Sequence, residues 1–301
     1  MAYTPVSVDL DELITEERSD DARDLDLRST RELVELMAQL DAAVPRAVES
    51  AGGATADVIE EVVERLRSGG RLVYVGAGSS GRQAAADAAE CEATFGTPAG
   101  LVIAVFAGDD DSVEDDAEAG AAAIRALTVG PADAVVGISA SGRTPYVVGA
   151  IEAAAGSGAF TAGVVSAPGS SLASIADREI HVVVGPELIA GSTRLRAGTA
   201  QKLVLNQIST VSMIRLGKVF DNLMIDLVAG NEKLRVRARR IVQTVTGAAP
   251  DEADEALAAA DGSAKVAIVS LLTGLDAAEA RTRLAANGGD IRPVLEGARA
   301  R

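Results

Sequence analysis

The segment LVYVGAGSSGR, residues 72–82, decides the fold class of this chain. An apolar run from Leu72 to Val75 ends in a loop of glycines and serines, and a helical pattern follows the loop. A buried strand, a glycine loop and a helix in this order predict one unit of a parallel sheet that helices cover. Such a loop places backbone N–H groups at the start of the helix, where they can bind an anion.

The same pattern occurs a second time, in the run AVVGISASGRTPYVVGAIEAA at 134–154. Here a strand leads into a Ser/Gly loop at 139–143, and Pro145 lies near the first turn of the helix. Three more strands are predicted, at 101–108, 161–167 and 179–185. An acidic helical stretch is predicted at 111–127. We expect the strand at 101–108 to be buried. The alternation predicts an α/β protein, a doubly wound parallel sheet of about five strands with flavodoxin-like layering, and its ligands should bind at the carboxyl ends of the strands.

Other segments flank the predicted sheet. Residues 1–28 are polar and charged and predict an extended arm. Helical patterns occur at 31–44, 54–69, 191–217 and 236–245. From Gly247 to Arg301, Asp, Gly and Pro interrupt the pattern and predict an appendage of three short helices. We therefore divide the chain into three parts. Residues 1–55 form an N-terminal arm and helix, residues 56–230 a sheet domain, and residues 231–301 a C-terminal helical region.

Composition and charge disfavour several classes of partner. The formal net charge of −16 argues against nucleic acid and against anionic membrane surfaces. The N-terminus lacks the apolar core of a signal peptide, and no apolar run approaches the ~18 residues of a membrane span. With one cysteine, Cys91, no intrachain disulfide can form, and we expect a cytoplasmic protein. Because the sequence has a single histidine and no cysteine pair, we expect no metal and no cofactor.

Two ligands compete for the glycine loop at 76–81. Its letters match G-x-G-x-x-G, which is typical of a dinucleotide site, but Asp109 lies farther along the chain than that motif's ribose-binding carboxylate. A phosphate monoester is the alternative, because two matched loops would offer it hydroxyls and backbone N–H groups. The predicted ligand residues are Ser79, Ser80, Gly81, Ser139, Ser141 and Thr144. A purely structural explanation also stands, in which the glycines make turns and the serines cap helices.

Five segments resemble the N-acetylmuramic acid 6-phosphate etherase family: GAGSSGR, DAAEC, SASGRTPYV, GSTRLRAGTAQKLVLNQIST and GKVFDNLMIDLVAGNEKLRVRA. That family belongs to the sugar isomerase (SIS) superfamily and is related to the glucokinase regulatory protein. The resemblance implies a homodimeric carbon–oxygen lyase for an amino-sugar phosphate. Such enzymes cleave the D-lactyl ether of N-acetylmuramic acid 6-phosphate, and the products are N-acetylglucosamine 6-phosphate and D-lactate, in the recycling of cell-wall sugar. A sugar-phosphate sensor without turnover and a sugar phosphate isomerase stay open as alternatives.

Elimination of lactate needs a base at C2 and an acid at the ether oxygen, and two carboxylates can supply them. The resemblance implies Glu90, in DAAEC, as one of the two. The best match to the family's E-G-A-E-D pattern puts Glu118 at the other position, and Glu114 is its competitor. Because Glu90 lies nine residues beyond Gly81, roughly 13 Å along a helix, a kink or a partner subunit would have to bring it to the phosphate.

Three further residues are weaker candidates for sugar binding. Arg143 follows the second loop, and Glu187 and Lys202 lie in segments that match the family. The chain departs from the family pattern at 109–121 and at 92–94, where it lacks the usual prolines. These departures favour the sensor among the alternatives.

Overall fold

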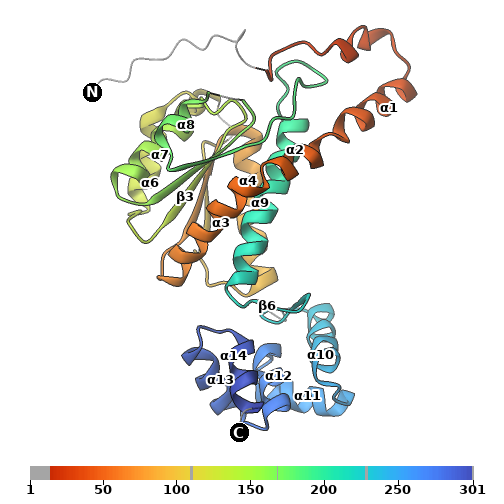
Figure 1. Ribbon diagram of the computed structural model, residues 1–301, viewed down its shortest axis with the longest axis vertical. Helices are drawn as coiled ribbons and strands as arrows, with labels where there is room; N and C mark the ends of the chain where they lie inside the picture. The colour runs from red at the N-terminus through yellow and green to blue at the C-terminus, as the bar shows by residue number, and fades with distance from the viewer. Residues whose placement is uncertain (1–13, 109–110, 168, 228–229, 300–301) are drawn as a thin grey trace. The chain divides into compact units, whose positions relative to one another are not determined.

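The computed structural model describes residues 14–108, 111–167, 169–227 and 230–299, and Figure 1 shows the order of their elements. By packing, the chain forms two compact units. The first contains residues up to 88 together with 101–208, and the second contains 89–100 together with 209–301. The division into 1–55, 56–230 and 231–301 stays a prediction.

The first unit is built on a parallel sheet of five strands in the order β2-β1-β3-β4-β5. The strands are β1 (Leu72–Gly76), β2 (Val102–Phe106), β3 (Ala134–Ile138), β4 (Phe160–Val165) and β5 (Arg178–His181). This is the flavodoxin-like order, in which successive connections run to opposite sides of β1 and leave a crevice between β1 and β3. The predicted α/β fold class is therefore confirmed.

Two details of the strands differ from the predictions. The prediction of a buried strand at 101–108 is wrong, since β2 is only half-buried and Phe106 is 38% exposed. The reason is its position at the edge of the sheet, where it has one neighbouring strand. The last strand also ends earlier than predicted, at His181, although the residues beyond it still alternate between buried and exposed.

Helices cover both faces of the sheet (Figure 1). The helix α3 (Gly52–Arg67) packs against β1, β3, β4 and β5. On the other face, α6 (Ala117–Ala126) and α7 (Pro145–Gly156) bury apolar side chains in one cluster with Val73, Val75 and Val135. In β1, Val73 and Val75 alternate with Leu72 and Tyr74, which are also fully buried, because β1 has a neighbouring strand on each side and helices cover both faces of the sheet.

The acidic stretch predicted as one helix at 111–127 forms two helices, α5 (Asp111–Glu114) and α6. Asp116 separates the two helices because its backbone is extended. Its side chain caps α6 by accepting a 2.9 Å hydrogen bond from the N–H of Ala119. The two carboxylates that sequence reasoning could not separate, Glu114 and Glu118, consequently lie on different helices.

The N-terminal segment contains more turns than predicted. Of the predicted arm, residues 1–13 lie outside the described residues, and the rest contains 3₁₀ turns at Asp20–Ala22 and Leu25–Leu27. Ser29 and Glu32 form a capping box at the start of α1 (Thr30–Asp41). A short α2 (Val44–Ser50) follows, with Pro45 in its first turn.

Two long helices, α4 (Gly78–Phe95) and α9 (Arg196–Arg215), begin among residues of the first unit and end among residues of the second. The short α8 (Ser171–Ile175) completes the first unit. Among the described residues, no single helix has the length and apolar composition of a membrane span, although the sharply bent pair at 250–273 meets those criteria when its two helices are taken together.

After the end of α9, the second unit contains a hairpin, β6 (Val219–Phe220) and β7 (Leu223–Met224), and then helices. They are α10 (Glu232–Thr246), α11 (Pro250–Ala259), α12 (Ala264–Thr273), α13 (Ala277–Ala286) and α14 (Ile291–Arg299). The prediction of three helices after Gly247 is therefore wrong, because four form. Lys265 is buried and donates to Asp226 at 2.6 Å and to the carbonyl of Gly289 at 2.8 Å, and its burial lowers the pKa of its ammonium group.

Candidate phosphosugar site

The strands β1 and β3 are neighbours, and each ends in a serine loop that opens a helix. Gly76 at the end of β1 pairs with Ile138 at the end of β3, so the two loops start side by side. In a sheet of this order, ligands bind at the carboxyl edge between these two strands. The fold therefore puts both predicted phosphate loops at its usual ligand position.

The first loop approaches the sheet so closely that it requires glycine. A Cβ added at Gly81 would lie 2.5 Å from the Cβ of Phe106 and 2.9 Å from the carbonyl oxygen of Gly76. Ser79 and Ser80 lie in the first turn of α4 and are partly exposed. The N–H of Gly81 donates to the carbonyl oxygen of Ala77 at 3.1 Å, and the N–H groups that precede it in this turn have no helical partner. Such groups bind phosphate in other proteins.

The second loop brings three hydroxyl groups together. The Oγ of Ser139 lies 2.8 Å from the Oγ1 of Thr144 and 3.4 Å from the Oγ of Ser141. The N–H of Gly142 donates to the same Ser139 oxygen at 3.0 Å. Thr144 is the N-cap residue of α7, but its side chain makes no capping hydrogen bond. The first turn of α7 and its hydroxyls therefore form a cluster of neutral donors.

A single cation belongs to this loop. Arg143 is half-buried, and its side chain forms no hydrogen bond or ion pair with any described residue. An unpaired guanidinium beside neutral donors favours an anionic ligand.

The two candidates for the second carboxylate have different surroundings. Glu114, the last residue of α5, is half-buried and reaches the first loop, because a Cβ added at Gly78 would lie 2.7 Å from its Oε1. Glu118 is exposed in the first turn of α6, and its carboxylate forms an ion pair with Arg125. The structure thus places Glu114 beside the first loop and leaves Glu118 at the surface.

Glu90 is exposed on α4, which continues unbroken from Gly78 to Phe95. Nine residues separate Glu90 from Gly81, which corresponds to roughly 13 Å at ~1.5 Å per residue. The helix itself therefore does not carry this carboxylate back towards the loop at its own N-terminus.

Glu187 and Lys202 have partners within the protein. Glu187 is fully buried, and its carboxylate accepts 2.9 Å hydrogen bonds from the N–H groups of Arg196 and Ala197 at the start of α9. A carboxylate in this position satisfies helix donors and stabilises the helix dipole. The Nζ of Lys202 lies 3.6 Å from the carboxylate of Asp87, which is 3% exposed. The sugar-binding roles of Glu187 and Lys202 stay predictions.

Sequence reasoning missed a polar contact between the first loop and α9. The Oγ of Ser80 donates a 2.9 Å hydrogen bond to the Oε1 of Gln201. Gln201 is 2% exposed, and its Nε2 is buried without a hydrogen-bond partner among the described residues. The Oε1 of Gln83, in the second turn of α4, is also buried without a partner among them. Because a buried polar atom without a partner is costly, these two amides indicate that a ligand or water completes the site.

The arrangement can bind an anion and move a proton. Hydroxyls, helix N–H groups and Arg143 supply the donors, and Glu114 supplies a carboxylate beside them. No group of three His, Cys, Asp or Glu side chains is placed to hold a metal ion in the described parts of the chain.

Comparison with known proteins decides the family. The chain is 56% identical over 293 residues to an N-acetylmuramic acid 6-phosphate etherase of Rubrobacter xylanophilus, with 95% of this chain and 97% of that protein covered. This chain belongs to the N-acetylmuramic acid 6-phosphate etherase family. The etherase of Streptomyces coelicolor is 46% identical to this chain over 309 residues, and the alignment covers 99% of each of the two chains. Residues 54–155 also match the glucokinase regulatory protein N-terminal SIS domain.

Solved structures show the same fold in more distant proteins. A phosphoheptose isomerase from Francisella tularensis superimposes with a TM-score of 0.52 at 18% identity, over 62% of this chain and 100% of that one. A putative phosphosugar isomerase involved in capsule formation from Bacteroides fragilis gives 0.51 at 22% identity, over 64% and 95%. At these identities the likeness shows the SIS fold alone. The family name therefore rests on the etherase sequences.

Proposed function

We propose that this chain cleaves the D-lactyl ether at C3 of N-acetylmuramic acid 6-phosphate and releases N-acetylglucosamine 6-phosphate and D-lactate. The observation that carries the proposal is the pair of serine loops at the adjacent ends of β1 and β3, with Glu114 against the first of them. Membership of the etherase family supports the substrate. We place the reaction in the cytoplasm, as the sequence predicts.

The phosphate would bind at the two loops. Ser139, Ser141 and Thr144 offer their hydroxyls from one side, and the first turn of α4 offers backbone N–H groups from the other. Arg143 adds a charge-assisted contact. Ser80 would orient the first loop through its hydrogen bond to Gln201.

The chemistry is an elimination followed by an addition. In the open-chain sugar, the C2 proton lies next to the C1 aldehyde, so a carboxylate can remove it and leave an enolate. The electron pair of the enolate then forms the C2–C3 double bond as the C3–O bond breaks, and a carboxylic acid protonates the departing lactate oxygen. Water adds at C3 and a proton returns to C2. Two carboxylates divide these proton transfers, and no oxidation or reduction occurs.

We propose Glu114 and Glu90 as these carboxylates, with Glu114 in the position first predicted for Glu118. Glu114 lies beside the loop, whereas the Glu118 carboxylate pairs with Arg125 at the surface. Glu90 is exposed and roughly 13 Å along α4 from Gly81, so we propose that it serves the loops of the other subunit in a homodimer.

A subunit-complementation experiment tests this arrangement. The variants Glu90→Gln and Glu114→Gln are each expected to release almost no D-lactate as homodimers. When the two variants are co-expressed, a mixed dimer keeps one site with Glu114 from one subunit and Glu90 from the other. Because half of the dimers are mixed and each has one intact site, lactate release should return to about a quarter of the wild-type rate. No recovery, with mixed dimers present, would mean that both carboxylates act within one subunit.

A further inference from the structure

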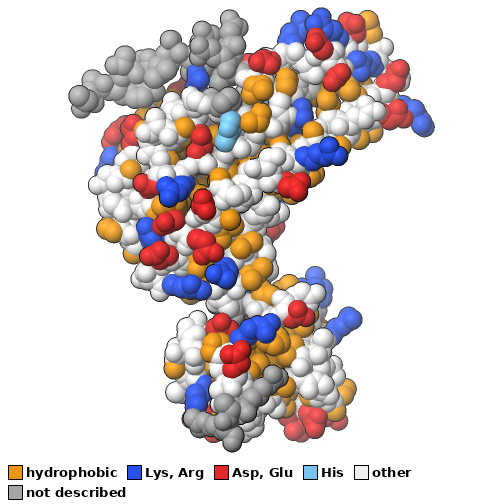
Figure 2. Space-filling view, in the orientation of Figure 1, with side chains coloured by type: hydrophobic (Ala, Val, Ile, Leu, Met, Phe, Trp, Pro, Cys, Tyr) orange, Lys and Arg blue, Asp and Glu red, His pale blue; other side chains and the backbone are white. Residues whose placement is uncertain are grey.

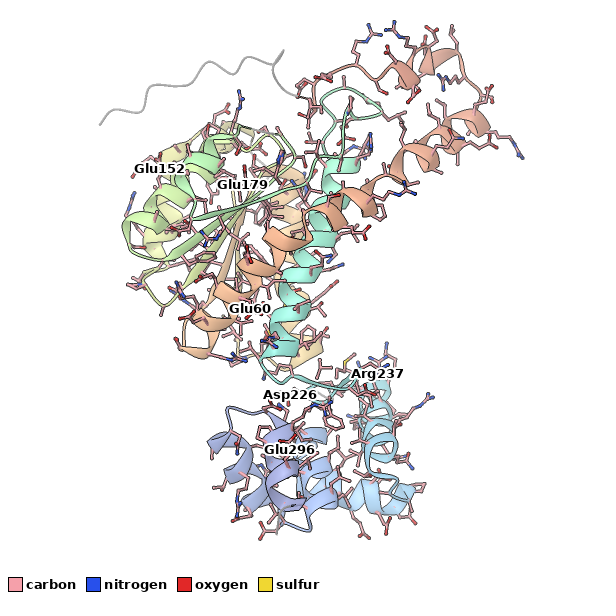
Figure 3. The ribbon with its side chains drawn as sticks, in the orientation of Figure 1. Glu60, Glu152, Glu179, Asp226, Arg237 and Glu296 are labelled. Carbon is pink, nitrogen blue, oxygen red and sulfur yellow. The ribbon has the colours of Figure 1, made fainter. Side chains whose placement is uncertain are left out.

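The helix α10 carries four arginines, and they differ in their partners. Two of them are paired: Arg235 with Glu232 at 2.9 Å and Arg239 with Asp254 at 2.5 Å. Arg237 and Arg240 form no side-chain hydrogen bond or ion pair with any described residue. Both side chains are exposed, and they lie three positions apart on the helix, in a chain with 44 acidic and 28 basic residues. Figure 2 shows basic side chains over α10, and Figure 3 labels Arg237 there.

The two unpaired arginines line the same cavity. It has a volume of about 250 Å³ and lies between α10 and the hairpin of β6 and β7. Arg237, Arg240 and Ile241 have the spacing of one helix face, and Leu223 and Met224 come from the hairpin. Every lining residue belongs to the second unit, whereas the serine loops belong to the first. The cavity is lined by none of the residues that form the serine loops.

Two acidic residues belong to the hairpin segment, and no ion pair joins either of them to Arg237 or Arg240. Asp221, in the turn between β6 and β7, is exposed, and Asp226 is engaged by two lysines. The carboxylate of Asp226 lies 3.1 Å from the Nζ of Lys218 and 2.6 Å from the Nζ of Lys265. It therefore has two cations of its own. The positive charge of Arg237 and Arg240 stays available to a ligand.

We propose that this cavity binds a small organic anion that carries an apolar group. The guanidinium groups of Arg237 and Arg240 present paired N–H donors, which match the oxygens of a carboxylate or a phosphate. Ile241 is buried and Met224 is half-buried, so they form an apolar floor for the rest of the ligand. The flexible thioether of Met224 can adjust to ligands of different shape. The inference does not depend on the proposed lyase activity.

The methionines provide a direct readout in the intact protein. The chain has four, and among the described ones Met224 lines the cavity while Met37 and Met213 lie on α1 and α9. The full chain is labelled with ¹³C-methyl methionine and titrated with butyl phosphate, pentanoate, inorganic phosphate and 1-butanol. The Met224 resonance is assigned with Met224→Leu. Comparison of butyl phosphate with pentanoate tells whether the cavity prefers a phosphate or a carboxylate head group. Inorganic phosphate lacks the apolar part of these ligands, and 1-butanol lacks their charge.

We expect a saturable shift of the Met224 resonance with at least one of the two organic anions, and no shift of Met37 or Met213. The Arg237→Ala/Arg240→Ala variant should bind that anion at least about tenfold more weakly, because both charge-assisted contacts are lost. Arg235→Ala is the matched control, since its arginine lies on the same helix but is paired, and it should bind like wild type. If the double variant has a lower melting temperature than wild type, the single variants Arg237→Gln and Arg240→Gln are tested in its place.

Three results would overturn the proposal. The first is a Met224 resonance that does not move with either anion up to about 10 mM. The second is equal binding by wild type and by the arginine variants. The third is an affinity for inorganic phosphate as high as that for the organic anion, because the apolar floor would then contribute nothing.

Discussion

Ser80, in the first turn of α4, donates a 2.9 Å hydrogen bond to Gln201 of α9, although the two residues are 121 positions apart in the sequence. Gln201 is almost fully buried, so the bond holds the first serine loop in one orientation relative to α9. The contact leaves the Nε2 of Gln201 without a partner among the described residues. A bound sugar phosphate or its water can supply that partner.

Replacing Gln201 should therefore weaken substrate binding more than it slows the chemistry. For Gln201→Leu, we expect KM for the sugar phosphate to rise about tenfold, since one hydrogen bond to the loop is lost, with a smaller change in kcat. Steady-state lactate release measures both constants. Asn206→Leu, at an exposed amide on the same helix, is the control and should leave KM unchanged. An unaltered KM in Gln201→Leu would show that the loop does not depend on this amide.

The assignment of the second carboxylate gives a sharper test. Glu114→Gln should lower kcat by at least about 100-fold, because a proton transfer loses its donor or acceptor. Glu118→Gln should stay within about twofold of wild type, because an exposed ion pair contributes little. The rates of D-lactate release by the two variants decide between them. The opposite order would return the role to Glu118.

Glu187 should matter for folding and little for binding. In Glu187→Gln the amide can accept from only one of the two N–H groups of α9, and we expect the free energy of unfolding to fall by about 2 kcal/mol. Urea denaturation measures this change, and lactate kinetics of the folded variant should give a wild-type KM. A raised KM with unaltered stability would mean that Glu187 contacts the sugar.

Stability should depend on pH through Asp133, which joins the start of β3 to the start of β1. Its carboxylate accepts from the backbone N–H, Nε and Nη2 of Arg71, at 2.9, 3.1 and 2.8 Å. Burial raises the pKa of Asp133, but the hydrogen bonds from Arg71 and Gly130 outweigh it, and the pKa lies below its usual value. The ion pair therefore stabilises the fold above the unfolded pKa of ~3.9, and this contribution is lost as the pH falls through the folded pKa.

The variant Asp133→Asn makes this dependence measurable. At pH 7 we expect it to lower the free energy of unfolding by about 2 kcal/mol, since one partner of a largely buried pair is removed. The difference from wild type should shrink as the pH falls below the unfolded pKa of ~3.9 and through the lower folded pKa, because the wild-type carboxyl group is then protonated in both states. Urea denaturation at pH 7 and at successively lower pH gives both values. A difference that is constant with pH would mean that the charge of Asp133 has no role.

The sheet and its loops could be predicted because their signals are local. LVYVG and AVVGI are buried on both faces as central parallel strands, and a serine loop follows each of them directly. The edge position of β2 could not be predicted, because the apolar run at 101–108 looks the same whether one strand or two lie beside it.

The surroundings of the candidate site residues depend on contacts that no local pattern records. Glu114 and Glu118 lie in one acidic run, and only the break at Asp116 turns them towards different surroundings. Gln201 meets Ser80 only in the folded chain, since 121 positions separate them in the sequence. Glu187 looks like a functional carboxylate in the sequence, but it folds back onto the start of α9, nine residues later.

The most direct test of the account is the product that the wild-type enzyme forms from N-acetylmuramic acid 6-phosphate in ²H₂¹⁸O. Elimination followed by water addition predicts unlabelled D-lactate, and N-acetylglucosamine 6-phosphate with deuterium at C2 and ¹⁸O at C3. A bound sugar phosphate that stays intact would contradict the account and favour a sensor. A product with a shifted carbonyl and its lactyl ether still in place would favour an isomerase.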